Sequence, residues 1–562
     1  MSKSPFVEGK GLESGDTPVT YVRDLGNEFA MDTMGRRAVA EKYQGTEEDQ
    51  YTMKVLGRTQ ELRRNFGFLP TLGFASTLIA TWEIILATLL SGLTNGGTAG
   101  LFWGYLVVAT GFFLVYLSVA EMASMAPTSG GQYHWVSEFA PRSCQRYLSY
   151  LTGWLTFIGW QSGVAGTSFM VGTTIQGLIV LNYDSYSFRS WHGTLLVIGV
   201  TLFGIAFNTI FARRLPLVEN ILMVLHVLGW FSIALPLWIL GPRADAKAVF
   251  TEYRNNGGWS TNGTSFLVGL NPLVISLLGF DCVAHMCKRS CSPCLPLITF
   301  NSRINTVAEE IRDASRTVPV SIIWGKLLNA VFGLGMIITA IFVWGDMDEI
   351  ALSPTGYPFI QIFYNITHSY AGTNIMTAII IVTLTACVVA TVATASRQIW
   401  SFARDNGPPF SATLSRVKPG WDIPLNAVLI SLAVTVLLSL INLGSSVALT
   451  AMFSLSLASG MTSYTLCIGC VLLKRFHGEK LPDRRWTLGR LGMPVNIASL
   501  VFLFVMYIFS FFPAVTPVKP STMNWAIVMY GSVVLFATGY YFVIGKKVYI
   551  SPAERVRRDA SF

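Results

Sequence analysis

The chain has 562 residues, of which 52% are hydrophobic and only 13% are charged, and its mean hydropathy is +0.50. Soluble domains carry about 25% charged residues, so this composition argues against a soluble protein and places much of the chain in lipid. The net charge of +9 could indicate nucleic-acid binding, but most basic residues lie in the two tails and in the loops on one side of the apolar runs, so we interpret the excess as an orientation signal.

The first 67 residues form a polar leading segment. They contain no apolar core followed by a small-residue cleavage site, so we expect no signal peptide. Their many Gly and charged residues predict a mostly disordered cytoplasmic tail. The end of this tail, MKVLGRTQELRRNF, suits either a short amphipathic helix at the lipid headgroups or an ordered lead-in to the membrane part.

Twelve apolar runs follow, and each is long enough to cross a bilayer as a helix. Because only helices and closed barrels satisfy their backbone in hydrocarbon, runs of this length predict an all-α membrane protein. We expect a twelve-helix membrane domain over residues 68–545 and a cytoplasmic tail over 546–562. The predicted spans are 69–92, 99–124, 148–180, 192–211, 216–240, 265–286, 319–345, 373–397, 423–442, 447–473, 491–513 and 523–545.

The first and the sixth of these runs are interrupted by polar residues near their middle. Glu83 lies in the first, and Gly279, Phe280 and Asp281 lie in the sixth. A carboxylate inside a bilayer costs about 2.5–3.5 kcal/mol even on the most lenient insertion scale, so it normally faces a cavity or a partner. Broken helices at matching places in two halves of a membrane protein are the best sequence indication of a transporter's binding site.

The fifth span also carries polar residues. Glu219 and His226 are seven positions apart, two helical turns, and therefore share one helix face. They are candidate proton carriers, because an imidazole titrates near neutrality. The alternative is a buried, hydrogen-bonded pair near the cytoplasmic end of the span.

The basic residues predict the orientation. With the amino terminus inside, all but six of the 40 Lys and Arg residues fall in the tails or in inner loops, so the positive-inside rule places both termini in the cytoplasm. The exceptions are Lys326, within the seventh span, and five outer residues, Arg189, Arg243, Lys247, Arg254 and Lys519. The two Asn-x-Ser/Thr sequons, at Asn262 and Asn365, fall in loops predicted outside and are candidate glycosylation sites.

The cysteine positions do not suggest a disulfide framework. Four cysteines lie in spans and four on the predicted cytoplasmic side, where thiols stay reduced. Neither CxxC pair has the second pair or nearby histidine that completes a tetrahedral metal site, so we expect no metal and no cofactor. The eight are Cys144, Cys282, Cys287, Cys291, Cys294, Cys387, Cys467 and Cys470.

Three motifs follow even-numbered spans on the predicted cytoplasmic side. They read PTSGGQYHW (127–135), AEEIRDASRTVP (308–319) and SRQIWSFARDNG (396–407). Each alone could be a solvated connector. Together they resemble the amino acid–polyamine–organocation permeases, and most closely the fungal branch with the 4-aminobutyrate and choline permeases. The resemblance covers roughly residues 55–545.

The resemblance implies two inverted five-helix repeats, helices 1–5 and 6–10, and two extra helices. It also implies that substrate binds between the unwound centres of helices 1 and 6, usually with proton coupling, and it matches Phe280 to an aromatic gate. Helices 3 and 8 would flank this site. The implied substrate contacts are Thr81, Trp82, Glu83, Gly279, Phe280 and Asp281, with Gln161 and Thr385 from the flanking helices.

The first span departs from the family pattern, because no glycine stands between Gly73 and Gly92 and a bulky Trp82 lies beside Glu83. An aromatic ring with an acid suits a cationic head group, since a cation over Trp gains about 0.5–2 kcal/mol. This favours an amine-bearing substrate. Alternatively, Trp82 packs against a neighbouring helix and Glu83 forms a local hydrogen bond.

Residues 287–307 do not fit the family pattern. In relatives, the His-Met that ends the sixth span runs almost directly into the acidic helix, whereas here CKRSCSPCLPLITFNSRINTV intervenes. We interpret this segment as a translated intron or a gene-model error. The alternatives are a lineage-specific loop and a thiol sensor, and sequencing the spliced transcript distinguishes the artefact from both.

These features predict a secondary active transporter of amino acids or related amines, such as 4-aminobutyrate, choline or polyamines, driven by proton symport through alternating access. The alternative is a nutrient-sensing receptor of the same fold, for which a large signalling tail would be expected. No channel-like filter motif and no enzyme-like histidine cluster or nucleophile motif stands out. The expected partners are a small nitrogenous solute, protons and the bilayer of the plasma membrane; the sequence does not indicate an oligomeric state.

Overall fold

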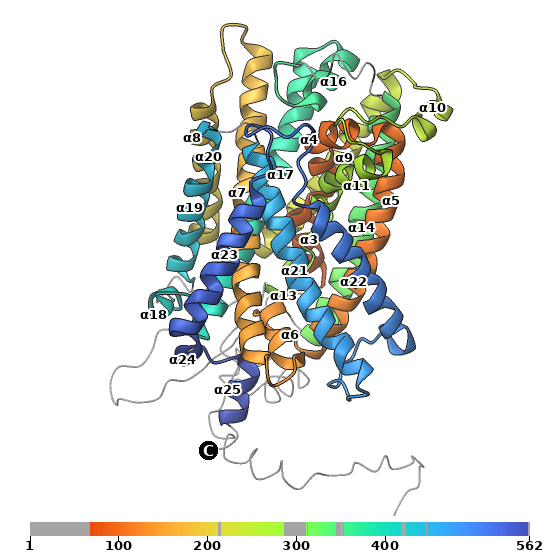
Figure 1. The fold of residues 1–562 in the computed structure, drawn as a ribbon. Helices are drawn as coiled ribbons and strands as arrows, with labels where there is room; N and C mark the ends of the chain where they lie inside the picture. Colours follow the sequence, from red (N-terminus) through yellow and green to blue (C-terminus); the bar gives the residue numbers. More distant parts are fainter. Residues whose placement is uncertain are drawn as a thin grey trace, which may run out of the picture.

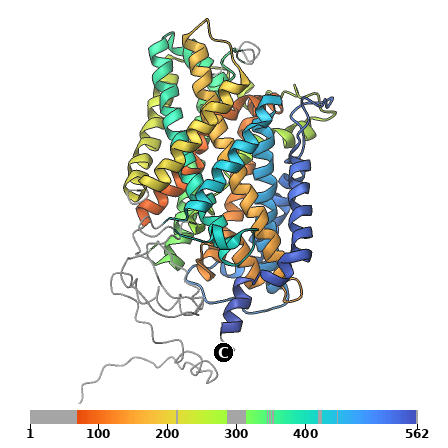
Figure 2. The same ribbon diagram turned by 90° about the vertical axis from the view of Figure 1, so that its left-hand side faces the viewer.

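The computed structural model describes residues 68–559, except for 212–214, 286–310, 312, 344, 346–349, 351–352, 418–422 and 445–446. The leading tail, the atypical segment 287–307 with its three cysteines and the start of the acidic motif lie outside the described residues. The described part is a bundle of long helices that run between two ends (Figure 1 and Figure 2), and it contains no β-strand. This confirms the predicted all-α membrane fold.

Eleven helical segments in the described part are long and apolar enough to cross a membrane, and they coincide with eleven of the predicted spans. They are α3–α4 (Phe68–Thr94), α5 (Gly97–Met125), α7 (Gln145–Asn182), α8 (Ser190–Ile210), α9 (Leu215–Leu240), α14 (Ala314–Val343), α17 (Tyr370–Arg404), α19 (Leu425–Ser439) with α20 (Ile441–Gly444), α21 (Ala448–Phe476), α22 (Gly492–Phe509), and α23 (Ala526–Tyr540) with η4 (Tyr541–Gly545) and α24 (Lys546–Val548).

The first and sixth spans are broken at the predicted places. The first divides at Ala80 into α3 (Phe68–Ile79) and α4 (Thr81–Thr94), and Ala80 has the left-handed angles φ 45 and ψ 48. The sixth consists of α11 (Asn262–Gly269), α12 (Asn271–Ile275) and α13 (Cys282–His285), with a non-helical stretch at 276–281. The polar residues in these two runs therefore marked interruptions of the helix.

Short helices define the two ends of the molecule. We call the end with α10 (Ala246–Thr251) and α16 (Pro358–Thr367) the upper end, and the end with α6 (Gln132–Phe139) and α25 (Pro552–Asp559) the lower end (Figure 1). Two shorter segments, α18 (Ser411–Leu414) and η3 (Gly489–Leu491), complete the described helices.

The second half of the bundle repeats the first with inverted direction. The second helices of the halves, α5 and α14, pack together, and so do the third helices, α7 and α17. In each half a short helix joins the second to the third helix; it is α6 at the lower end in one half and α16 at the upper end in the other (Figure 1). Equivalent elements at opposite ends are what the predicted inverted repeats require.

Helix α25 is bound to α6. The backbone N–H of Ala553 donates to the Ser137 hydroxyl at 2.9 Å, and the Arg555 guanidinium lies 3.0 Å from the Asp405 carboxylate. The Tyr133 hydroxyl donates to the same carboxylate at 2.9 Å. Helix α25 is thereby held against α6 and the end of α17.

A buried carboxylate joins three segments at the lower end. Glu121, near the end of α5, is 1% exposed and accepts hydrogen bonds from Arg475, at the end of α21, and from Arg484, at 3.0 Å, in the loop that follows. The backbone N–H of Leu488 donates to it at 3.2 Å. A carboxylate that satisfies this many donors is costly to remove.

We expect the substitution Glu121→Gln to lower the free energy of unfolding by about 2 kcal/mol, because two guanidinium groups lose their shared anion. Glu252→Gln is the matched control, since the Glu252–Arg254 pair is exposed and such pairs contribute about 0.2–1 kcal/mol. The measurement is thermal unfolding of the two detergent-purified variants. Equal shifts in both would show that Glu121 has no special structural role.

Candidate functional site

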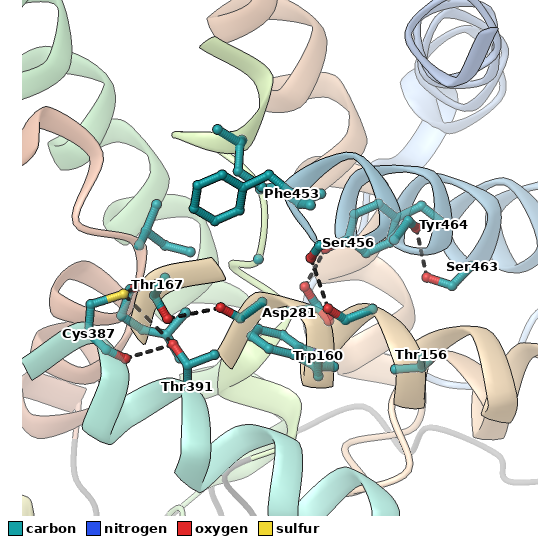
Figure 3. Close-up of a pocket in the computed structure, with 18 of the residues that line it drawn as sticks. Thr156, Trp160, Thr167, Asp281, Cys387, Thr391, Phe453, Ser456, Ser463 and Tyr464 are labelled. Atoms are coloured by element: carbon teal, nitrogen blue, oxygen red, sulfur yellow. Dashed lines mark hydrogen bonds between the residues drawn. The ribbon is translucent and has the colours of Figure 1, made fainter. Parts of the chain in front are cut away.

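A cavity lies where the two broken spans meet α7, α17 and α21; we call it the central cavity. Figure 3 shows side chains of these three helices gathered around the unwound segment that carries Asp281. The lining residues are Leu78, Ile79, Ile84, Gln132, Thr156, Gly159, Trp160, Gly163, Thr167, Ile275, Leu278, Gly279, Asp281, Cys387, Thr391, Phe453, Ser456, Gly460, Ser463 and Tyr464.

Asp281 is the only residue with a charged side chain among those that line the central cavity in the described part. Gln132, the first residue of α6, donates from Nε2 to Asp281 Oδ2 at 2.5 Å, and the Tyr464 hydroxyl donates to Oδ1. His285 Nε2 lies 3.4 Å from Oδ2 and 3.1 Å from Gln132 Oε1. The carboxylate, 2% exposed, is therefore fixed by three elements while it keeps one side toward the cavity.

The Tyr116 hydroxyl of α5 supports the unwound backbone next to Asp281. It donates to the carbonyl of Leu277 at 3.1 Å and accepts from the N–H of Gly279 at 2.8 Å. Gly279 has a φ of +117°, a value that L side chains rarely adopt. One hydroxyl thus satisfies backbone groups that would otherwise be unpaired where the helix is interrupted.

We expect Tyr116→Phe to destabilise the protein by about 2 kcal/mol, because two buried backbone groups lose their partner, and to reduce uptake by displacing Asp281. Tyr105→Phe is the matched control. Its hydroxyl donates only to the Ala330 carbonyl, at 3.0 Å, and Tyr105 does not line the central cavity. Thermal unfolding and uptake of both variants test this, and a selective loss of uptake in Tyr105→Phe would contradict it.

The rest of the central cavity combines aromatic rings with hydrogen-bond acceptors. Trp160 and Phe453 present ring surfaces. The hydroxyls of Thr391 and Ser456 donate to the backbone carbonyls of Cys387, at 2.6 Å, and Gly159, at 2.8 Å. A hydroxyl that donates to a carbonyl can offer its lone pairs to another group. The cavity therefore suits a small solute with a cationic nitrogen.

Two of the substrate contacts predicted from the sequence, Gly279 and Asp281, line the central cavity, and Thr81, Trp82 and Glu83 do not. Trp82 and Glu83 are fully buried on the other side of α4, toward α9. The Trp82 ring lies 5.7 Å from that of His226. Thr81 is buried against Gly333 of α14.

The other predicted contacts also lie away from the central cavity. Phe280 is buried between Tyr116, whose ring centroid is 5.2 Å away, and the backbone of Gly325. Gln161 is fully buried in α7, and its amide has no hydrogen-bond partner within the described ranges. Thr385 donates to the Ile381 carbonyl at 2.6 Å and lines a separate hollow beside α8.

A layer of buried polar groups lies between the first span and α9. His226 Nδ1 is 2.8 Å from Glu83 Oε1, and the Thr77 hydroxyl donates to Glu219 Oε2 at 2.8 Å. Glu219 and His226 thus bond to residues on opposite sides of the Ala80 break. Glu83 Oε2 and His226 Nε2 have no partner within the part of the chain that is described. This layer is enclosed, because Glu83, Glu219 and His226 are each at most 1% exposed.

Three further predicted features are placed by the structure. Asn262 is exposed at the start of α11, and Asn365 is half-buried in α16, where it accepts from Gln361 at 2.8 Å. Lys326 is fully buried in α14, and its Nζ has no hydrogen-bond partner among the residues that the structure describes. The five described cysteines are free thiols, and Cys387 Sγ donates to the Leu78 carbonyl at 2.7 Å.

Sequence reasoning missed several residues around Asp281. Gln132 lies directly after the glycine pair of the PTSGGQYHW motif, so the motif carried a signal, but its contact could not be read from it. Tyr464, Trp160 and Phe453 lie in spans among many other aromatic residues. Nothing in the local sequence of these three distinguishes a cavity residue from a lipid-facing or core residue.

The chain is similar in sequence to known permeases and transporters. A family model described as "Amino acid permease" matches residues 66–533. The chain is 28% identical to a putative amino acid/polyamine transporter of Macrophomina phaseolina, over 81% of this chain and 96% of that protein. It is 28% identical to the choline transporter of Saccharomyces cerevisiae, over 89% of this chain and 85% of that protein. It is 26% identical to amino-acid permease 2 of Neurospora crassa, over 90% of this chain and 90% of that protein. Among solved structures, a manganese transporter of Eremococcus coleocola aligns with 93% of this chain, and the alignment includes 99% of the transporter chain. The sequence identity is 10% and the TM-score is 0.49.

Proposed function

Since this chain belongs to the amino acid permease family and is a membrane transporter, we propose that it moves a small solute with a cationic nitrogen together with a proton. Choline, 4-aminobutyrate and polyamines are the candidate substrates. The names of the relatives, an amino acid/polyamine transporter and a choline transporter, support this range of solutes. The observation that carries the proposal is the lone carboxylate of Asp281 in an otherwise uncharged cavity.

The cationic nitrogen binds Asp281 in this proposal. A carboxylate in a cavity whose described lining includes no Lys or Arg attracts a cation strongly where water is excluded, and the aromatic surfaces of Trp160 and Phe453 add cation–π attraction of about 0.5–2 kcal/mol. Both oxygens of Asp281 already accept hydrogen bonds from Gln132 and Tyr464. The substrate is therefore attracted mainly by the negative charge of Asp281, and less by hydrogen bonds to its remaining lone pairs.

A substrate carboxylate, where there is one, binds the start of α4. This helix has no side-chain cap, so the N–H groups of its first turn remain available, and the positive end of the helix dipole favours an anion there. Ile84, in the same turn, lines the central cavity. A 4-aminobutyrate molecule would then extend between Asp281 and the Ala80 break.

The Glu83–His226 pair carries the proton. It is fully buried, and it joins α4, whose residue Ile84 lines the central cavity, to α9. A change of its protonation state alters the attraction between these helices, and α4 moves when the cavity changes its access. The upper end is extracellular in this proposal, because the positive-inside rule assigns both termini, and hence the lower end, to the cytoplasm.

Uptake in permease-deficient yeast tests the proposal. Labelled choline, 4-aminobutyrate, spermidine and neutral amino acids are supplied at external pH 5 and pH 7. We expect saturable uptake of at least one cationic solute, faster at pH 5, and competition by the unlabelled solute. Uptake restricted to an anionic solute would contradict the role of Asp281, and pH-independent uptake would contradict proton coupling.

A further inference from the structure

A second cavity lies between the central cavity and the upper end; we call it the upper cavity. It is enclosed by α4, α12, α21 and the chain near residue 512. Its lining includes Thr88, Ser91, Asn95 and Asn271, and no charged side chain among the described residues takes part in it. The upper cavity therefore offers uncharged polar groups in a largely apolar lining, and its described lining has no group that would hold a cation as Asp281 does.

Two residues, Phe453 and Ile275, line both cavities. On α21 the residues that line the upper cavity run from Leu449 to Leu457, whereas those that line the central cavity run from Phe453 to Tyr464, so the two sets overlap only over the turn that begins at Phe453. The sixth span repeats this order around Ile275, with Asn271 on the upper side and Gly279 on the central side. Phe453 and Ile275 thus form the boundary between the two cavities.

The Phe453 ring rests on a glycine. A Cβ atom added at Gly166 of α7 would lie 2.6 Å from Phe453 Cε1, so the ring packs directly against the backbone of α7. Phe453 is 6% exposed and Ile275 is 8% exposed. A phenyl ring makes no hydrogen bond that would fix it, and only dispersion contacts hold it in this position. Figure 3 shows the ring at the edge of the central cavity.

We propose that Phe453, with Ile275 opposite, is the gate between the central cavity and the upper end. A solute in the upper cavity reaches Asp281 only when the Phe453 ring moves away from its packing position against Gly166. When the ring returns, it closes the cavity and places an aromatic surface beside the bound cation. Phe280, the gate suggested by resemblance, lines neither cavity. This inference rests on the proposed binding site at Asp281.

The Cys387 thiol provides a natural reporter for the gate, because it lines the central cavity. A membrane-impermeant, trimethylammonium-bearing methanethiosulfonate is applied to intact cells, and modification of Cys387 is followed in time. The same variants with Cys387→Ser give the background from other cysteines. We expect Phe453→Ala to raise the modification rate on the order of 10-fold, since removal of the ring shifts the population toward the open gate.

Three matched variants separate gating from general loosening. Phe453→Tyr keeps the ring and should react at the parent rate. Leu457→Ala shortens a residue that lines only the upper cavity and should also leave the rate unchanged. Gly166→Ala places a methyl group where the ring sits and should give an intermediate increase.

The gate is overturned if Cys387 reacts at the parent rate in both Phe453→Ala and the double variant Phe453→Ala/Ile275→Ala. An equal increase in Leu457→Ala would also contradict it, because that result would indicate loosened packing. The modification assay needs no transported substrate. A faster reaction in Phe453→Ala together with a failed uptake panel would therefore refute the proposed substrates and support the gate.

Discussion

Asp281→Asn is expected to reduce uptake on the order of 10- to 100-fold, because the solute loses a charge-assisted interaction worth about 1.5–3 kcal/mol and its cationic nitrogen has no other anion among the described residues that line the cavity. Asn has nearly the same shape, and its carbonyl can still accept from Tyr464, so the unwound segment should keep its conformation although the hydrogen bond from Gln132 Nε2 to Oδ2 is lost. The change therefore removes the charge with little effect on the fold. Surface expression should remain normal.

The measurement is uptake of the solute that the parent transports, compared with Asp184→Asn, which changes an exposed carboxylate in the loop between α7 and α8. Asp184→Asn should transport like the parent. The loss in Asp281→Asn should appear in the apparent affinity as well as in the maximal rate, because the contact is made in the bound state. Parent-like uptake by Asp281→Asn would refute the proposed binding site.

Glu83→Gln is expected to abolish accumulation driven by the proton gradient. The amide cannot bind a proton reversibly, so His226 loses the ionisable partner that lies 2.8 Å away. Parent uptake should be faster at external pH 5 than at pH 7, because a symporter is driven by the higher external proton concentration. Uptake by Glu83→Gln should be slow and should not differ between the two pH values.

Counterflow distinguishes a coupling defect from a binding defect in this variant. Cells or vesicles preloaded with unlabelled solute should still exchange it for labelled solute through Glu83→Gln, because Glu83 does not line the central cavity. Asp281→Asn should fail in the same assay. Proton-driven accumulation by Glu83→Gln at the parent level would show that the pair does not couple transport to protons.

The two helix breaks were predictable from the sequence for different reasons. In the sixth span Gly279 supplies the backbone freedom that its φ of +117° requires, and Asp281 supplies the polar interruption. In the first span Ala80 adopts left-handed angles without a glycine, so no backbone signal marked the break. Only the intramembrane carboxylate of Glu83 indicated it. The breaks could therefore be located to within a few residues.

The partners of these carboxylates could not be read from the sequence. Helical periodicity showed that Glu219 and His226 share a face, but it does not tell which neighbouring helix that face meets. His226 bonds to Glu83 and Glu219 to Thr77, both more than a hundred positions away in the chain. Likewise, only the fold of α6 brings Gln132 to Asp281. Contacts between distant segments depend on packing, which a single sequence does not encode locally.

Helix α6 has only eight residues, yet it is bonded at its start to Asp281 through Gln132 and near its end to Ala553 through Ser137. This two-turn helix therefore connects α25 with the Asp281 carboxylate, the group that we propose holds the solute. Any covalent modification or partner that pulls the final residues away would shift the amide that orients the Asp281 carboxylate. The transport rate could thus be regulated through α25 without any group blocking the transport pathway.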